Sequence, residues 1–267
     1  MKTSAQRHDI ARLREEFARL AVEAGRPIMT IYDGPIASTD KSDGSPTTAA
    51  DSAAEEVILA GLARILPGVS VLAEESASTG LPSLGDVFVA VDPLDGTREF
   101  INRNGEFTVN IALVENGVPT VGVVYAPALG RLWLGGGGEA SAMAVPAGTT
   151  ALDVGQLKPI RTRTPPEGGL TAVASRSHLD ENTAAFLAKL SIASRRSIGS
   201  SLKFCLVAEG EADVYPRFGP TMEWDTAAGH AVVTSAGGRV VTPEGEPFLY
   251  GKSGTGFRNG SFVVWGQ

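Results

Sequence analysis

Two stretches near the start of the chain repeat apolar residues at the three- and four-residue spacing of an amphipathic helix. The first of these predicts a packing helix that ends near Pro35, and it contains Ile10, Leu13, Phe17, Leu20, Ala24 and Ile28. The second predicts a helix from Ala49 to Ile65, with Thr48 as its N-cap and Pro67-Gly68 as its stop. Asp51 then falls in the first turn of that helix.

Short runs rich in β-forming residues follow the second helix. They cover residues 69–72, 87–91, 107–114 and 118–125. The last two runs are joined by Glu115-Asn116-Gly117, which predicts a β-hairpin because Asn-Gly readily adopts the positive φ angles of a tight turn.

The second half of the chain alternates strand and helix patterns beyond a glycine loop at residues 135–138 and a proline-rich stretch at residues 159–166. Strands are expected at residues 171–174, 214–215, 239–241 and 261–264, and helices at residues 181–190, 201–209 and 226–235. This alternation predicts an α/β protein with an N-terminal half, 1–150, and a C-terminal half, 151–267, that together form one compact catalytic unit.

Composition and charge narrow the classes of partner. The 267 residues are 43% apolar and 20% charged, as in a compact globule, and 30 acidic against 23 basic residues give a formal charge of −7. This charge disfavours general affinity for nucleic acid or anionic membranes. An anionic ligand would therefore need a local cation or metal ion. Cys205 is the only cysteine, so no internal disulfide can form.

No membrane-spanning segment is expected. The longest mainly apolar stretches, 87–91 and 121–129, fall well short of the roughly 18 residues that a spanning helix needs. Charged residues interrupt the N-terminal apolar pattern, unlike a signal peptide. The expected location is the cytoplasm, and attachment to the inner membrane and the choice between monomer and homodimer stay open.

An acidic turn follows the apolar strand at residues 87–91. Its sequence is Asp92-Pro93-Leu94-Asp95-Gly96-Thr97, and such a turn can aim two carboxylates and the Leu94 carbonyl at one point. Hard divalent cations such as Mg²⁺ prefer oxygen ligands of this kind. An ordinary surface turn is an equally good explanation of this segment taken alone.

Three other acidic positions allow both a structural and a functional interpretation. Glu74-Glu75 follows another apolar strand and can emerge at the same sheet edge, although a Glu pair is more often a solvated loop. Asp225 precedes an Ala-rich helix, so it can cap that helix and also bind a metal. For Asp51, spacing alone favours a first-turn acid that complements the helix dipole over a member of an acidic pocket.

Three segments in this order resemble the signature of the inositol monophosphatase-like, lithium-sensitive phosphatase superfamily. They are Leu72-Ala73-Glu74-Glu75-Ser76, the acidic turn at 92–97, and Trp224-Asp225-Thr226-Ala227-Ala228-Gly229. The resemblance implies a layered αβαβα sugar-phosphatase fold with a mostly antiparallel N-terminal sheet.

Further segments are similar to the bacterial bisphosphate nucleotidases, a branch of that superfamily. They lie at residues 41–51, 98–110, 175–178, 197–205 and 215–220, so the likeness covers most of residues 40–240. It implies Mg²⁺-dependent hydrolysis of adenosine 3′,5′-bisphosphate (PAP) to AMP and phosphate, in sulfur metabolism and nucleotide recycling. The related phosphosulfate, PAPS, is a further expected substrate.

The resemblance also implies a role for individual residues. Glu74, Asp92, the Leu94 carbonyl, Asp95 and Asp225 would bind two or three Mg²⁺ ions. Thr97 and Glu74 would orient the attacking water, with Asp51 as an outer acid near a weaker metal. The scissile phosphate would lie against the amides of Gly96 and Thr97, and the substrate would also contact Asp225, His178, Ser200, Lys203 and Arg217.

Two alternatives to this function stay open. Inositol phosphates or fructose bisphosphate could replace PAP as substrate, which the segments at 199–203 and 215–217 disfavour. A catalytically inactive regulator that binds metal or nucleotide is the other alternative, although every acidic ligand and Thr97 are present.

Cys205 lies in an apolar helical stretch and is expected to be a buried core residue and no nucleophile.

Overall fold

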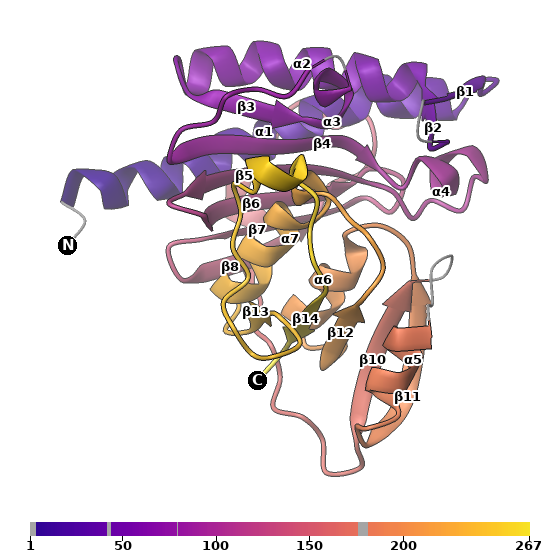
Figure 1. Ribbon diagram of the computed structural model, residues 1–267. Coiled ribbons are helices and arrows are strands. Elements are labelled where there is room, and N and C mark those ends of the chain that lie inside the picture. The colour runs from indigo at the N-terminus through magenta and orange to yellow at the C-terminus, as the bar shows by residue number, and fades with distance from the viewer. Residues whose placement is uncertain (1–3, 42–43, 79, 176–180) are drawn as a thin grey trace.

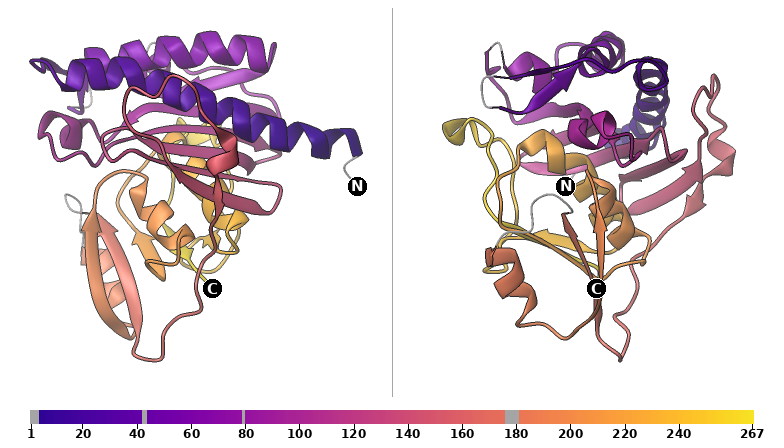
Figure 2. Two further views of the ribbon diagram at one scale, coloured as in Figure 1. Left: turned by 180° about the vertical axis from the view of Figure 1, so that it is seen from behind. Right: turned by 90° about the vertical axis from the view of Figure 1, so that its right-hand side faces the viewer.

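The chain folds into alternating layers of helix and sheet. The computed structural model describes residues 4–41, 44–78, 80–175 and 181–267. Helices α1 and α2 cover a first sheet, helices α6 and α7 lie beneath that sheet, and a second sheet with helix α5 completes the stack (Figures 1 and 2). This arrangement confirms the layered α/β fold expected from the sequence.

The outer helices form where the apolar spacing predicts them. Helix α1 spans Ser4–Tyr32 and α2 spans Ala49–Ile65. The Thr48 hydroxyl accepts a hydrogen bond from the amide of Ala50, and Asp51 completes a capping box, so the predicted start of α2 is confirmed. The apolar faces of α1 and α2 bury Phe17, Ile28 and Ile58 completely against the first sheet.

The first sheet has seven strands in the order β3-β4-β5-β6-β7-β8-β9. Only β3 and β4 are parallel, and every other neighbouring pair is antiparallel, as expected. The strands are β3 (Ser70–Ala73), β4 (Val87–Asp95), β5 (Thr108–Glu115), β6 (Val118–Ala126), β7 (Arg131–Gly136), β8 (Glu139–Ala144) and β9 (Lys158–Pro159). Both faces are buried, because Val89 and Val91 pack on the α1–α2 side while Phe88 and Ala90 pack on the other.

Two turns of this sheet bear on the sequence analysis. The Asn116-Gly117 hairpin is confirmed, with φ angles of 52° and 77° that suit a tight turn. The glycine loop expected at residues 135–138 is wrong in part. Gly135 and Gly136 belong to β7, and only Gly137 and Gly138, at φ 66° and 83°, form the turn into β8.

The second sheet is a five-stranded layer with the order β11-β10-β12-β14-β13. Its strands are β10 (Leu170–Ser175), β11 (Ile192–Ile198), β12 (Val214–Arg217), β13 (Arg239–Val241) and β14 (Phe262–Trp265). Helix α5 (Glu181–Leu187) packs on its outer face. Helices α6 (Leu202–Ala208) and α7 (Glu223–Ser235) lie between the two sheets and share one apolar core with both.

Short elements complete the described chain. They are β1 (Ser38–Asp40), β2 (Pro46–Thr48), α3 (Glu74–Ala77), α4 (Thr97–Ile101), and the 3₁₀ turns at Val154–Gln156 and Ser253–Thr255.

Helix α7 approaches the first sheet unusually closely, and two glycines permit it. A Cβ atom on Gly122 would lie 2.4 Å from the carbonyl oxygen of Ala228, and one on Gly135 would lie 2.5 Å from the Cα of Val232. Since no larger side chain fits there, these glycines set the distance of the helix from the sheet. That distance decides where the first turn of α7 can deliver its side chains.

Candidate active site

The parallel pair β3 and β4 brings two acidic segments to one edge of the sheet. In the register, Ala73 lies beside Val91, so the next residues along the chain, Glu74 and Asp92, lie at the same edge of the sheet. The sequence-based expectation of a shared edge is therefore confirmed. Glu74 opens helix α3, while Asp92 lies at the bulged end of β4.

The turn after Asp92 is held by local hydrogen bonds. The Asp92 carboxylate accepts a bond of 3.0 Å from the Leu94 amide. Gly96 then adopts φ 95°, where a side chain would be strained and would crowd the Glu106 carbonyl oxygen at 3.0 Å. The glycine lets the chain turn directly into α4, so Thr97 begins that helix beside the carboxylates.

Helix α7 contributes the acidic residue from the C-terminal half. The sequence analysis placed Asp225 ahead of a helix starting at residue 226, but α7 begins at Glu223 and Asp225 lies in its first turn. Its Oδ2 accepts a 2.8 Å bond from the Met222 amide, which closes the start of the helix. Because the Asp225 side chain caps the helix from within its first turn, α7 begins two residues before Asp225 and is longer than expected.

The carboxyl groups of Glu74, Asp92, Asp95 and Asp225 influence one another strongly. Burial raises the pKa of each of them, and for Asp92 the negative charges of Glu74, Asp95 and Asp225 raise the pKa further. The pKa of Asp225 is raised well above its usual range by burial and then by Asp95 and Glu74. Four carboxyl groups from separate segments thus share one weakly solvated space that favours a cation.

Lys41 supplies part of the positive charge that these carboxylates favour. Its Nζ lies 2.6 Å from Oε1 of Glu74 and 2.6 Å from Oε1 of Glu75. Burial lowers the pKa of Lys41, but the two glutamates outweigh burial and raise it overall. Within the described parts of the chain, no three acidic, histidine or cysteine side chains close around one point as the ligands of a bound ion do.

Asp51 caps α2 and also contacts the acidic turn through Thr97. Its Oδ2 accepts bonds from the Thr48 amide and hydroxyl at 2.8 and 2.7 Å, which caps α2. Its Oδ1 accepts a 3.1 Å bond from the Thr97 hydroxyl, which is also 3.3 Å from the Leu94 carbonyl oxygen. Asp51 is 1% exposed, and burial raises its pKa.

A cleft of about 310 Å³ joins the carboxylates to residues of the C-terminal half. Its lining contains Glu74, Asp92, Leu94, Asp95, Gly96, Thr97, Ser200, Lys203, Arg217 and Asp225. The structure therefore brings together all the expected site residues except Asp51, which reaches the cleft through Thr97, and His178, which lies outside the described residues.

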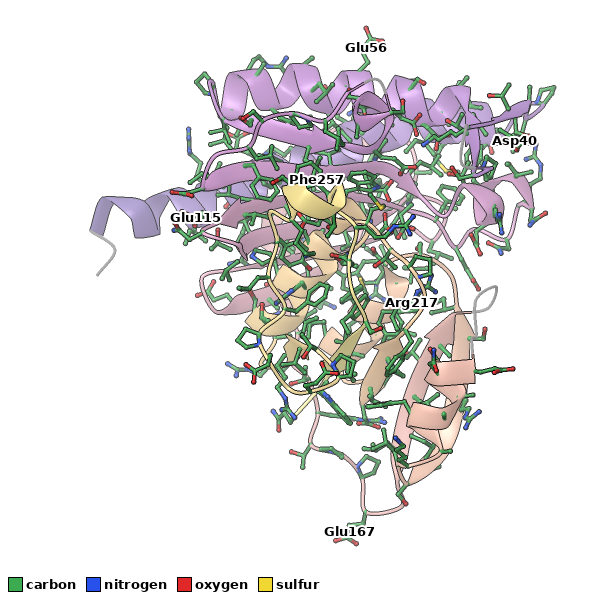
Figure 3. All side chains as sticks on the ribbon, viewed as in Figure 1. Asp40, Glu56, Glu115, Glu167, Arg217 and Phe257 are labelled. Carbon is green, nitrogen blue, oxygen red and sulfur yellow. The ribbon has the colours of Figure 1, made fainter. Side chains whose placement is uncertain are left out.

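Two buried cations line the same cleft as the carboxylates. Lys203 is 6% and Arg217 is 9% exposed, and in Figure 3 Arg217 lies between the first sheet and the C-terminal sheet. The Lys203 ammonium donates to the carbonyl oxygens of Ser200 at 2.5 Å and Ile198 at 3.4 Å. Arg217 donates from Nη2 to the Pro220 carbonyl oxygen, whereas its buried Nε has no protein partner among the described residues.

The sequence analysis missed several residues that support this site. Glu55 on α2 accepts a 2.9 Å bond from the Glu75 amide and one from the Ser76 hydroxyl, which holds the turn that carries Glu74. Glu106 accepts a 2.8 Å bond from the Gly199 amide. Asn110 and Ser201 contact Asp95. Only Asn110 carried a usable signal, as a polar residue inside an apolar strand.

The chain resembles proteins of known activity over nearly its full length. The model of the inositol monophosphatase family matches residues 9–261. The chain is 47% identical over 246 residues to the 3′(2′),5′-bisphosphate nucleotidase CysQ of Salmonella typhimurium, which covers 88% of this chain and 93% of that relative. The corresponding protein of Escherichia coli strain K12 is 46% identical over 241 residues, with the same coverage.

Solved structures agree with these relatives. The crystal structure of CysQ from Bacteroides thetaiotaomicron matches with a TM-score of 0.79 and 40% identity, covering 95% of this chain and 96% of that chain. An inositol monophosphatase from Anabaena matches with a TM-score of 0.73 and 28% identity.

No helix among the described residues is both long and apolar enough to cross a membrane.

Proposed function

Because the chain belongs to the inositol monophosphatase family, we propose that it is a metal-dependent 3′(2′),5′-bisphosphate nucleotidase that hydrolyses PAP to AMP and phosphate. The relatives with nearly half of their residues identical carry this activity in their names. The proposal places the enzyme in sulfur metabolism and nucleotide recycling, with PAPS as a second substrate.

Mg²⁺ is the metal that the donor atoms of the cleft suit best. The proposed ligands are the carboxylates of Glu74, Asp92, Asp95 and Asp225 and the Leu94 carbonyl, and all of these donors are oxygen. Burial raises their pKa values, and repulsion between neighbouring carboxylates raises those of Asp92 and Asp225 further, which a divalent cation would relieve. The size of the acidic cluster supports two or three ions. When bound, Mg²⁺ supplies an activated water and neutralises charge on the leaving oxygen.

Thr97 and Asp51 would orient the attacking water. The Thr97 hydroxyl donates its hydrogen to Asp51, so its oxygen retains lone pairs that can accept a hydrogen from water. A water held there and by Glu74 presents an oxygen lone pair to the phosphorus atom. The amides of Gly96 and Thr97 are the proposed donors to the scissile phosphate, and no covalent enzyme intermediate is required.

One observation carries the choice of a bisphosphate: two buried cations line the same cleft as the carboxylates. The charge of a monophosphate would already be met by metal bound at the carboxylates. Lys203 and Arg217 supply positive charge for a second phosphate. The two halves of the chain then act as one catalytic unit, because the carboxylates come mainly from one and these cations from the other.

The direct test measures phosphate release from PAP, inositol 1-phosphate and fructose 1,6-bisphosphate, each with and without Mg²⁺. We expect the highest kcat/KM on PAP, and activity that disappears when a chelator removes Mg²⁺. Faster hydrolysis of inositol 1-phosphate than of PAP would contradict the proposed substrate. Absence of phosphate release from all three substrates at saturating Mg²⁺ would favour a regulator instead.

A further inference from the structure

A buried polar network connects β5 to the segments that carry Asp95 and Asp225. Asn110 is fully buried and Ser201 is 1% exposed, although Asn110 is followed in β5 by four apolar residues, 111–114. Burying an amide or a hydroxyl is unfavourable unless its hydrogen bonds are satisfied. The partners of these two side chains therefore indicate what the network stabilises.

The oxygen of Ser201 lies at the centre of the network. Its Oγ is 3.0 Å from Oδ2 of Asp95 and 2.8 Å from the carbonyl oxygen of Asp225. The Asn110 amide donates to this Oγ at 3.0 Å and lies 3.5 Å from the same Oδ2 of Asp95. One hydroxyl thus contacts two of the acidic residues that line the cleft, and these residues come from β4 and α7.

The orientation of Asn110 is fixed from its other side. The Thr108 hydroxyl donates to Oδ1 of Asn110 at 3.1 Å, so the amide nitrogen is directed at Ser201 and Asp95. Thr108 and Asn110 occupy the same face of β5 because side chains two residues apart in a strand point the same way. The backbone of β5 thereby helps to determine where the hydroxyl of Ser201 can lie.

We propose that Asn110 and Ser201 are positioning residues that hold the Asp95 carboxylate in place relative to Asp225 and so set the affinity of the site for Mg²⁺. This inference rests on the proposed function. The two side-chain contacts engage Oδ2 of Asp95, and the backbone of Ser201 also donates a hydrogen bond to this carboxylate, so the Ser201 segment holds Asp95 at more than one point. Hydrogen bonds that orient a ligand typically change metal affinity about ten- to a hundred-fold.

A purely structural role predicts something different. A satisfied polar network also fixes the packing of neighbouring elements, and losing it lowers stability without any specific effect on the metal. The two roles are distinguished by measuring Mg²⁺ binding and stability separately, in the absence of substrate.

The test compares Ser201→Ala with the wild type by calorimetric titration of the metal-free protein with Mg²⁺. We expect the Mg²⁺ dissociation constant to rise about ten- to a hundred-fold, and the activity of the variant on PAP to recover as Mg²⁺ is raised. Thr162→Val is the matched control, because Thr162 is also buried, its hydroxyl donates to the Ala236 carbonyl oxygen at 3.3 Å, and it does not line the cleft. This control should bind Mg²⁺ like the wild type.

Asn110→Leu provides the second variant, since it removes the amide while roughly conserving volume. We expect weaker Mg²⁺ binding here too, and a double variant that loses less affinity than the product of the single losses, because both act through one carboxylate. Unchanged Mg²⁺ affinity in Ser201→Ala overturns the inference, as does an equal loss in Ser201→Ala and Thr162→Val. If the wild type itself binds no Mg²⁺, the proposed metal site fails, and the inference with it.

Discussion

Single residues give the cleft both signs of charge. Carboxylates from α3, β4 and α7 line it together with Lys203 and Arg217. Both cations contact backbone carbonyls, and Asp95 partly offsets the lowering of the Lys203 pKa by burial. A substrate with phosphates at two positions of one sugar matches a cleft that offers a proposed metal site and two cations.

Removal of the Arg217 guanidinium should weaken binding of PAP more than it slows turnover. The contact with the uncleaved phosphate exists in both the ground state and the transition state, so its loss raises KM. A charge-assisted hydrogen bond contributes roughly 1.5–3 kcal/mol, so Arg217→Ala should lower kcat/KM on PAP about ten- to a hundred-fold. Steady-state kinetics on PAP and on adenosine 3′-monophosphate measure this.

Two comparisons make that prediction specific. Arg195→Ala removes the same charge from an exposed position on β11 and should leave both substrates unaffected. The monophosphate lacks the gripped group, so its turnover by Arg217→Ala should change little. Equal losses on both substrates would instead assign Arg217 to the metal centre or the fold.

Lys203 should limit activity at alkaline pH. Burial lowers its pKa to about 8, an effect that Arg217 reinforces and Asp95 opposes. In the proposed function the charged ammonium binds phosphate, so kcat/KM on PAP should fall as pH rises through about 8, with KM rising. The variant Lys203→Met should have a low kcat/KM that no longer declines at alkaline pH. The same decline in the variant and the wild type would rule out Lys203 as its source.

Site residues differ in how far the sequence could identify them. Asp92, Asp95 and the Leu94 carbonyl lie in one turn, so spacing allowed a metal site there as readily as a surface turn. Glu74 and Asp225 were candidates from their positions, and the role of Thr97 came only from the likeness to a known family. Ser201, Glu55 and Glu106 could not be found this way, because each acts on a residue far away in the chain. Such pairs form only when the sheets and helices have packed.

Among the elements, those with a local signal were predicted and those defined by packing were not. Helix α2 and the Asn116-Gly117 hairpin start and stop on residues with specific backbone preferences. Strand β7 was missed because Gly135 and Gly136 are typical of a loop. Here glycine is present in a strand because α7 packs so closely that a side chain on Gly135 would not fit. Strand β11 was missed because nearly all of it is exposed, so it has no alternating apolar pattern.

A single methyl group on Gly122 should disturb both α7 and the metal site. The added Cβ would lie 2.4 Å from the Ala228 carbonyl oxygen, so the helix must shift, and overpacking of this kind costs about 1–3 kcal/mol. Because α7 carries Asp225, Gly122→Ala should also weaken Mg²⁺ binding. Denaturant unfolding and Mg²⁺ titration measure the two effects.

The control for this substitution is Gly260→Ala, where an added Cβ meets nothing within 4 Å. It should leave both quantities close to the wild type. An unchanged free energy of unfolding in Gly122→Ala would show that α7 is not constrained by the sheet at this point.

At the scale of the whole molecule, Mg²⁺ should stabilise the fold more at alkaline than at acidic pH. Burial raises the pKa of Glu74, Asp92, Asp95 and Asp225 in the metal-free protein, so their contribution to stability is present at low pH and is lost as pH rises and they ionise. Mg²⁺ binds the ionised form and relieves this loss. The increase in Tm caused by Mg²⁺ should therefore be larger at about pH 8 than at about pH 5.5.

Asp95→Asn tests the origin of that increase. It removes one anionic ligand, so it should abolish turnover, leave the metal-free protein folded, and reduce the rise in Tm on adding Mg²⁺. An increase in Tm that is the same at both pH values and in the variant would mean that Mg²⁺ stabilises the protein elsewhere.

The position of β14 has a consequence for how an active molecule is made. This strand, Phe262–Trp265, lies between β12 and β13 and pairs with both, although it follows every proposed ligand in the chain. During synthesis, Asp225 and Arg217 therefore leave the ribosome before the sheet beneath them can close. Domains fold as units during translation, and partly folded ones expose apolar surface. All the proposed active-site residues are therefore synthesised before the protein can complete its fold and become active. During that interval the nascent chain exposes apolar surface to which chaperones can bind.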